Sequence, residues 1–525
     1  MLIDGRTLNE GEVINTDICI LGGGPAGITL ANELNGNALD VALLDAGGEQ
    51  YEAQVQELYE ADSVPEYYPD PKISRLRFLG GASNHWGNNT SPFSPIDFEK
   101  RDWIGNSGWP ISYDEMVPYY QKAAVYCQTG DDGYSSEHWL PLMGLNDLLS
   151  EAKFSRLGIA KASLPPTRFY VSHGKPLVES DNVKLYTYAS VVDLEFDESD
   201  KRIISATFTS YNGKTHKVVA DRFVLSMGGM ENARMLLLFN EKYKNKIGNK
   251  NDIVGRYFMD HPTMNAAHLI SDLPKLESMT RFEGQRFLVA FFELQEKVLK
   301  ENELINLRMP VTSGTEYGMS DGISSFHILK NALIRGELPE DLFTHYGNLI
   351  LDADMVIEAI ARKQFDTKVF ESAKNSAGFQ IPMMVEQIPE KNNRIYLSSK
   401  KDKFGLNKLS IDWQVSERNR ELMWRSLEVF ARDMGITSIG RLRLLKERAS
   451  RLFGDQMGFG HHHMGTTRMS DTPENGVVDK NCKVFDVGNL YVAGSSVFPT
   501  GSHVPPTLTI SAMSARLAEH LKSGV

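Results

Sequence analysis

One glycine-rich turn constrains the fold of this chain more than any other feature. The apolar run Ile18–Leu21 ends in the glycine-rich segment Gly22–Gly27, and small and apolar residues then recur at helical spacing. A second apolar run, Val41–Leu44, follows. Strand, glycine turn, helix and strand in this order predict a βαβ unit of the kind that binds dinucleotides.

The positions within this turn suit the phosphates of a dinucleotide. Gly22 permits the tight turn, Gly24 lets the backbone approach a pyrophosphate, and Gly27 allows the helix to pack closely on the strand. The N-terminus of the helix offers free N–H groups to phosphate oxygens. Asp45, at the end of the second strand, is placed to accept hydrogen bonds from ribose hydroxyls. The pattern by itself fits FAD and NAD equally well.

Glycine turns near both ends of the chain, with a different middle, predict two domains. The order of strand, glycine and helix returns at residues 223–239, and a strand at 489–494 also runs into a turn. We therefore predict an α/β fold, α+β overall. Residues 1–265 and 455–525 are expected to form a discontinuous nucleotide-binding domain, interrupted by a second domain of residues 266–454.

A long segment at about 75–110 is rich in Gly, Asn, Ser, Trp and Pro and has no periodicity. Ordered loops of this length in compact domains are usually functional, so we expect this one to contribute to the site. Trp86, Trp103 and Trp109 are able to stack on sugar rings, although core packing is the better expectation for at least two of them.

Composition excludes several classes of protein. The 525 residues carry 56 basic and 68 acidic side chains, a formal net charge of −12, so the basic footprint of a nucleic-acid-binding protein is absent. No apolar run reaches about 18 residues, so no membrane span is expected. The three cysteines form no zinc pattern and indicate a reducing compartment. With no apolar signal core near the N-terminus, a cytoplasmic location is expected.

Three of the 13 histidines stand together at His461, His462 and His463. Successive side chains on an extended strand point to opposite faces, so three in a row do not easily converge on one metal ion, and no metal is expected. A structural role suits any one of them. For the cluster, catalysis is the better reading, because imidazole accepts a proton near neutral pH.

Six segments, taken in order, carry a family resemblance that spans nearly the whole chain. They are Leu21–Gly48, Gly80–Trp86, Val254–Pro262, Glu386–Pro389, Gly465–Met469 and Asn489–Ser514. Together they resemble the glucose–methanol–choline (GMC) oxidoreductases, FAD enzymes that oxidise alcohols. The second and last segments look most like the branch of pyranose oxidases, gluconate-type dehydrogenases and bacterial glycoside 3-oxidases. The resemblance implies a Rossmann-like FAD-binding domain and a substrate-binding domain built on a mostly antiparallel sheet.

The resemblance also implies a catalytic base, since the family places its histidine as His-x-x-Gly-Thr, here His462. This residue would take the hydroxyl proton while the alcohol carbon passes hydride to the flavin. The family's second catalytic residue, Asn or His, stands directly before Pro-Thr-Leu-Thr, where this chain has Pro505. His503, two residues earlier, either supplies the missing contact as a second catalytic residue or is a loop residue without a role.

The cofactor site implied by the resemblance draws on most of these segments. His85, in the long loop at about 75–110, lies where pyranose oxidases attach the flavin covalently. The alternative is that His85 lies beside the flavin ring without a covalent bond to it. The expected FAD-binding residues are Gly22, Gly24, Gly27, Asp45, Gly80, Gly81, Ser83, His85, Trp86, Val191, Gly228, Gly494, Ser495, Thr507 and Leu508.

The expected activity is therefore FAD-dependent oxidation of the CH–OH group of a sugar, glycoside or polyol to a carbonyl. An alternative is a biosynthetic flavoenzyme that oxidises a secondary alcohol of a terpenoid, steroid or other natural product. A flavin-binding protein without turnover and an NAD-dependent dehydrogenase are further alternatives. The expected partners are a small-molecule alcohol and an electron acceptor, either oxygen or a quinone or other carrier. The sequence does not indicate an oligomeric state.

Overall fold

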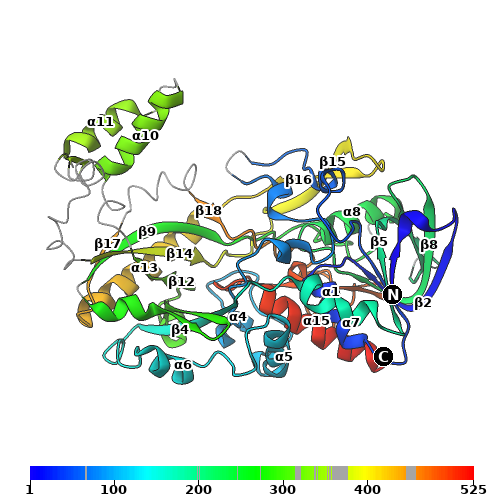
Figure 1. Ribbon diagram of the computed structural model, residues 1–525, viewed down its shortest axis with the longest axis horizontal. Helices are drawn as coiled ribbons and strands as arrows, with labels where there is room; N and C mark the ends of the chain where they lie inside the picture. The colour runs from blue at the N-terminus through cyan, green and yellow to red at the C-terminus, as the bar shows by residue number, and fades with distance from the viewer. Residues whose placement is uncertain are drawn as a thin grey trace.

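The structure is a computed structural model. It describes residues 1–524 except 66–67, 198, 200, 245, 272, 314–320, 336–338, 340, 352, 354–355, 358–376 and 445–456. Figure 1 shows two lobes, each built on a sheet, with both ends of the chain in the same lobe. Among the described helices, none has the length and apolar character needed to cross a membrane.

The first lobe is built on an eight-stranded sheet. Its strands are β1 (Leu2–Asp4), β2 (Val13–Leu21), β3 (Val41–Leu44), β5 (Val183–Thr187), β6 (Ser190–Phe196), β7 (Ile203–Thr209), β8 (Thr215–Leu225) and β19 (Leu490–Val492). They lie in the order β1-β5-β3-β2-β8-β7-β6, and β19 also pairs with β8. The pairs from β1 to β8, and β19 with β8, are parallel, whereas β8–β7 and β7–β6 are antiparallel.

The predicted βαβ unit is confirmed. Strand β2 pairs in parallel with β3, from Ile18 opposite Val41 to Leu21 opposite Leu44, and helix α1 (Pro25–Leu34) connects them. These strand residues are almost completely buried, as the continuous apolar runs require for a sheet covered on both faces. The C-terminal helix α15 (Thr507–Lys522) packs against α1 and α5 (Tyr113–Tyr126), so the last residues complete the first lobe.

The second lobe is built on a nine-stranded sheet. Its strands are β4 (Ser155–Ser163), β9 (Pro262–Ser271), β10 (Thr280–Glu283), β11 (Arg286–Leu294), β12 (Leu307–Pro310), β13 (Thr312–Ser313), β14 (Ala377–Val385), β17 (Arg441–Leu444) and β18 (Gly458–Phe459). The main order is β10-β11-β12-β14-β9-β17, with β4 on β11, β13 on β14 and β18 on β9. Every pair is antiparallel, which confirms the mostly antiparallel sheet expected for this lobe.

The remaining elements cover these sheets or connect them. Strands β15 (Arg394–Lys401) and β16 (Asn407–Asp412) form a hairpin whose first strand contacts α8. The other helices are α2 (Ala53–Gln56), α3 (Pro71–Ser74), α4 (Pro95–Phe98), α6 (Ser136–Met143), α7 (Phe169–Val178), α8 (Glu231–Tyr243), α9 (Glu296–Glu301), α10 (Asp321–Arg335), α11 (Leu342–Leu351) and α13 (Glu417–Ile436).

One strand of the second sheet comes from the segment that we assigned to the nucleotide-binding domain. Strand β4 pairs with β11 along nine residues, from Ser155 opposite Leu294 to Ser163 opposite Arg286. No glycine turn or change in composition marks β4 in the sequence, so the pattern placed it with its neighbours in the chain. The α/β fold class is confirmed, whereas the proposed domain limits stay a prediction.

Candidate active site

A cavity of about 630 Å³ lies between the two lobes. Four residues that line it, Gly22, Asp45, Ser226 and Gly494, come just after the carboxyl ends of β2, β3, β8 and β19. The edge formed by the carboxyl ends of parallel strands is where open α/β sheets bind ligands. The cavity therefore occupies the place that the fold provides for a dinucleotide.

The glycine turn fits a pyrophosphate group. A Cβ on Gly22, whose φ is +117°, would lie 2.6 Å from the Ser226 carbonyl oxygen, and one on Gly27 would lie 1.9 Å from the Gly22 oxygen. Gly24 differs, because its backbone is extended with φ −81° and a Cβ there would meet no protein atom within 4 Å. Gly24 lines the cavity at the start of α1, which has no side-chain cap. The free backbone N–H groups of the first turn of α1 are thus available to phosphate oxygens.

Asp45 comes directly after β3 and contacts the glycine turn. Its carboxylate accepts hydrogen bonds from the backbone N–H groups of Gly23 and Gly47, each at 2.8 Å. Each carboxylate oxygen accepts more than one hydrogen bond, so Asp45 keeps capacity for ribose hydroxyls of a ligand in the cavity. Burial raises the pKa of Asp45, and the two N–H groups oppose that shift.

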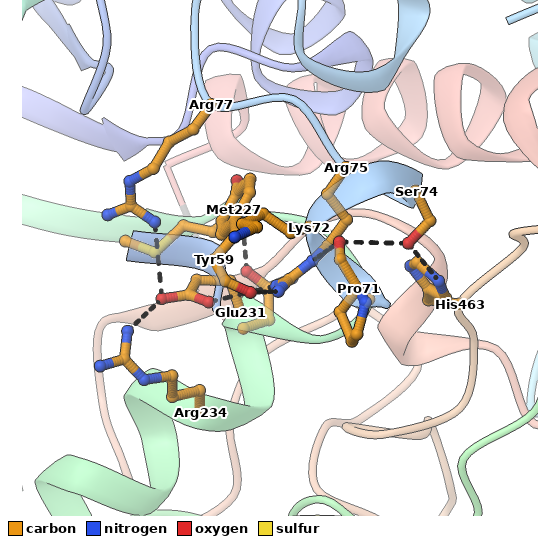
Figure 2. A network of polar contacts seen from close by, with 12 residues as sticks. Tyr59, Pro71, Lys72, Ser74, Arg75, Arg77, Met227, Glu231, Arg234 and His463 are labelled. Atoms are coloured by element: carbon orange, nitrogen blue, oxygen red, sulfur yellow. Dashed lines mark hydrogen bonds and ion pairs between the residues drawn. The ribbon is translucent and has the colours of Figure 1, made fainter. Parts of the chain in front are cut away.

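A buried network of charges borders the cavity (Figure 2). The Glu231 carboxylate lies between Arg234 at 2.7 Å, Arg75 at 3.4 Å and Arg77 at 3.7 Å. Burial alone would raise the pKa of Glu231, but the three guanidinium groups lower it to about 2. Glu231, Arg75 and Arg77 all line the cavity, so the network fixes one wall of it.

The three histidines follow β18 and all line the cavity. His461 has φ +56° and is exposed toward the cavity. His463 is buried, and its Nε2 lies 3.4 Å from the Ser74 hydroxyl, as Figure 2 shows. Burial lowers the pKa of His462 and of His463 well below the ordinary value. The part of the chain that the structure describes contains no group of three or more His, Cys, Asp or Glu side chains placed to hold a metal ion.

His462 is paired with a second histidine, His261, at the start of the second lobe. Their Nδ1 atoms lie 2.8 Å apart, and His261 Nε2 lies 3.0 Å from the carbonyl oxygens of Gly501 and Ser502. Carbonyl oxygens only accept hydrogen bonds, so His261 Nε2 carries a proton. Burial lowers the pKa of His261 to about 4, which leaves it neutral with a bare Nδ1.

The protonation of His462 follows from this arrangement. The bare Nδ1 of His261 accepts a hydrogen bond, so Nδ1 of His462 is the donor and carries that ring's single proton. Nε2 of His462 therefore has a free lone pair. A general base for an alcohol proton needs this form of imidazole.

Asp260 holds the backbone of both histidines. Its Oδ1 accepts the N–H of His261 at 2.7 Å and that of His462 at 2.8 Å, and its Oδ2 accepts the Tyr68 hydroxyl at 2.8 Å. Burial raises the pKa of Asp260 to about 6. The Gln387 side chain accepts the Asp260 N–H at 2.8 Å, so this residue of the Glu386–Pro389 segment supports the histidine pair from behind.

The structure does not bring His503 to the same cavity. Its Nε2 lies 2.7 Å from a Glu293 carboxylate oxygen, and its ring lines a separate cavity beside Phe291. The preceding residue, Ser502, has φ +57°, a left-handed turn that interrupts the path of the chain. Pro505 lines the cavity that contains His462. The geometry therefore gives no support to His503 as the second member of a catalytic pair.

Most of the other expected cofactor residues line the cavity. These are Gly81, Ser83, His85, Trp86, Val191, Gly228, Gly494, Ser495 and Thr507. Gly80 and Leu508 lie behind the lining: the Gly80 N–H donates to the Gly23 oxygen at 2.8 Å, and Leu508 is in the core. Sequence reasoning missed His261, which contacts His462, although its segment was recognised. It also missed Arg308, which lines the cavity.

The parallel sheet and the glycine turn at the cavity are features of a dinucleotide-binding protein, and His462 lines the same cavity. A family model described as GMC oxidoreductase matches residues 389–514. The fructose dehydrogenase large subunit of Gluconobacter japonicus is 24% identical and aligns over 97% of this chain and 98% of its own. A 2-methyl-1,2-propanediol dehydrogenase of Mycolicibacterium austroafricanum is 23% identical, over 96% and 95%.

A solved structure, pyridoxine 4-oxidase from Mesorbium loti, has a TM-score of 0.60 at 17% identity and covers 96% of this chain and 98% of its own. It supports the fold. The family match over residues 389–514 and the full-length relatives support the assignment of this chain to the FAD-dependent oxidoreductases of the GMC type. The glycine turn, the free start of α1 and Asp45 fit that cofactor.

Proposed function

We propose that this enzyme oxidises an alcohol CH–OH group of a sugar, glycoside or polyol to a carbonyl, with His462 as the base. The observation that carries the proposal is the His261–His462 pair. It leaves a lone pair on His462 Nε2 in the cavity that also contains the cofactor turn. The family motif points to His462 as the base. The hydrogen bonds of the His261–His462 pair point separately to its protonation state.

In the proposed reaction, the substrate hydroxyl gives its proton to His462 Nε2. This transfer raises the electron density at the alcohol carbon and favours departure of its hydride. FAD, when bound, supplies the hydride acceptor. His261 keeps the ring of His462 oriented by accepting the Nδ1 proton, and Asp260 fixes the backbone of both residues.

The lining away from the glycine turn supports a hydroxylated substrate over a hydrophobic one. Asn89, Thr263 and Arg308 are polar, and Met384 and Phe459 are apolar. Polar groups in such a wall favour a substrate that forms hydrogen bonds with them, and a terpenoid or steroid has few groups that can do so. The C-glycoside 3-oxidase of Arthrobacter globiformis matches a short part of the chain. It is 30% identical over 129 residues, which cover 24% of each chain.

The electron acceptor and the attachment of FAD form the remaining part of the proposal. Relatives include proteins named oxidases and dehydrogenases, so oxygen and a quinone or other carrier both stay candidates for the electron acceptor.

His85 is exposed toward the cavity, a position compatible with a covalent bond to FAD. Acid precipitation of the holoenzyme decides this point: flavin in the pellet supports the bond, and flavin wholly in the supernatant excludes it.

The test of the base uses anaerobic flavin reduction by an alcohol that reduces the wild-type holoenzyme. His462→Ala should slow this step by about 10²-fold or more, because general-base help is typically about 10²–10⁴-fold. Since burial lowers the pKa of His462, the wild-type rate should stay constant as pH falls through 6.5 and decline only well below it. A wild-type rate in the His462→Ala variant would contradict the mechanism.

A further inference from the structure

Three adjacent strands of the second sheet place a row of side chains over the cavity. Arg308 on β12 lies opposite Met384 on β14, and Met384 lies opposite Thr263 on β9. Residues directly opposite each other on paired strands have side chains on the same face of the sheet. All three line the cavity, as does Phe459 of β18, the strand that leads to the histidines.

Arg308 is a buried cation whose hydrogen-bonding capacity is mostly unused. The residue is 5% exposed, and Nη2 donates to Asn89 Oδ1 at 2.9 Å. Its Nε is buried without a hydrogen-bond partner, and the guanidinium carbon lies 4.9 Å from the centre of the Phe291 ring. Among the described residues, no carboxylate forms an ion pair with it. A guanidinium has five N–H donors; Nε is enclosed and Nη2 uses one hydrogen bond, so the remaining donors on Nη1 and Nη2 are the ones left for a ligand.

The carboxylate whose charge acts on Arg308 is that of Glu293, and its two oxygens are bound to other residues. One oxygen of the Glu293 carboxylate lies 2.8 Å from Arg156 Nε, and the other lies 2.7 Å from His503 Nε2. By contrast, the buried Arg101 donates hydrogen bonds to both carboxylate oxygens of Glu386. A buried charge without a counter-charge is costly, so an anionic ligand would offset a cost that the protein alone leaves in place.

The cavity lining around Arg308 contains no carboxylate among the described residues. The wall formed by the row and its neighbours contributes Arg308, Asn89, Thr263 and His462 but no carboxylate. The acidic residues that line the cavity, Asp45 and Glu231, belong to the first lobe, where they bond to backbone N–H groups and to arginines. Burial lowers the pKa of Arg308 to about 10, so the group stays protonated at neutral pH.

We propose that Arg308, together with Asn89, binds a carboxylate of the substrate, so that the alcohol oxidised here belongs to a sugar acid or a similar polyhydroxylated carboxylate. A planar guanidinium with free donors matches the two oxygens of a carboxylate. The inference rests on the proposed function for the oxidation step, but binding of the carboxylate is separable from it.

The test compares charged and neutral molecules of the same carbon skeleton on the holoenzyme. The pairs are D-gluconate with D-glucitol and D-glucuronate with D-glucose. The response is the change in flavin absorbance without oxygen, whether it comes from binding or from reduction. In at least one pair, the carboxylate should reach half of its maximal effect at a concentration at least about 10-fold lower than its partner. Equal concentrations within both pairs, or no response to either carboxylate, would overturn the proposal.

Variants then assign the preference to this residue. Arg308→Gln should weaken the response to the carboxylate far more than the response to the neutral member, which abolishes the difference within the pair, whereas Arg308→Lys should keep part of it. Arg468→Gln is the matched control, because Arg468 is also 5% exposed with unpaired nitrogen atoms but does not line the cavity. It should keep the preference. An equal loss for both members in Arg308→Gln would instead assign the guanidinium to the reaction or the flavin and contradict the proposal.

Folding of the variant has its own measurement. Arg308→Gln removes an unpaired buried charge, so its melting temperature without ligand should be no lower than that of the wild type. Saturating D-gluconate should raise the melting temperature of the wild type and not that of Arg308→Gln. If carboxylates bind in this Arg308-dependent way but no probe reduces the flavin, the proposed oxidation fails while the carboxylate site stands.

Discussion

Nδ1 of His261 faces Nδ1 of His462 at 2.8 Å, while Nε2 of His261 faces two backbone carbonyl oxygens. This contact determines which nitrogen of His462 is bare. His261 is thus a positioning residue: it acts on the substrate only through the tautomer and orientation of its neighbour. An unpaired imidazole would divide its proton between both nitrogens and would turn more freely.

Replacing His261 should therefore slow the reaction without removing the base. His261→Leu removes the acceptor for the His462 Nδ1 proton, and we expect flavin reduction to slow by about 10-fold, which corresponds to about 1.4 kcal/mol. His261→Asn places an amide oxygen near the lost Nδ1 and should recover part of the rate. The measurement is anaerobic stopped-flow reduction over a range of pH, with flavin content as the control for folding. Equal rates in His261→Leu and the wild type would show that the contact has no part in positioning the base.

His503 gives a contrasting prediction. Because its ring pairs with Glu293 in another cavity, His503→Gln should reduce flavin at close to the wild-type rate, in contrast to His462→Ala. The glutamine keeps a donor for the buried Glu293 carboxylate, and Arg156 remains its second partner. Single-turnover rates of both variants with the same alcohol provide the comparison. A loss of 10-fold or more in His503→Gln, at unchanged melting temperature, would restore His503 to the catalytic pair.

Substitutions at two glycines of the turn should distinguish loss of cofactor binding from loss of folding. Gly24→Val should yield folded protein with little FAD, because its side chain would enter the cavity and meet no protein atom within 4 Å of its Cβ. Gly27→Ala is the paired variant: its Cβ would lie 1.9 Å from the Gly22 oxygen, so the protein should be destabilised with or without FAD. Flavin-to-protein absorbance ratios and melting curves distinguish the two outcomes. Full FAD occupancy in Gly24→Val would show that the pyrophosphate does not approach this position.

Asp260 should make stability depend on pH in a defined direction. Burial raises its pKa to about 6 from an ordinary value of 3.8, so the folded protein holds this proton more tightly than the unfolded chain. The contribution of this group is fully present below about pH 3.8 and is lost as pH rises through about 6. Asp260→Asn keeps Oδ1 for the two backbone N–H groups and has no such proton to lose. Its free energy of unfolding should therefore rise relative to the wild type between pH 5 and pH 8, as measured by urea titration; a constant difference would argue against the shift.

The sequence was most informative about features formed by residues that are close together in the chain. Gly22, Gly24 and Gly27 are close together in the chain, and their spacing alone predicted the turn, the helix and the adjoining strands. His462 was found through its motif. His503 was selected because it is close to Pro505 in the chain, but the left-handed Ser502 precedes it and Glu293, from another strand, binds its ring.

The residues that sequence reasoning missed depend on pairing between distant segments. Arg308 looks like an ordinary strand residue until β12 lies beside β14 and the carboxylate of Glu293 is taken by other partners. His261 belongs to a recognised segment, yet its role arises from a contact with a residue 201 positions away. No local pattern reports such a contact, because register between strands is decided by the packing of the whole sheet.

The cavity takes one wall from Gly22 and another from Gly494 and Thr507, and α15 packs on α1 to hold them together. During synthesis, the first of these segments leaves the ribosome long before the last. The nascent chain can form β2 and α1 early, but it has no closed pocket for FAD until the segment that forms α15 has been added. FAD should therefore bind only after α15 has packed on α1, and a chain truncated before α15 should accumulate without flavin however well the rest of it folds.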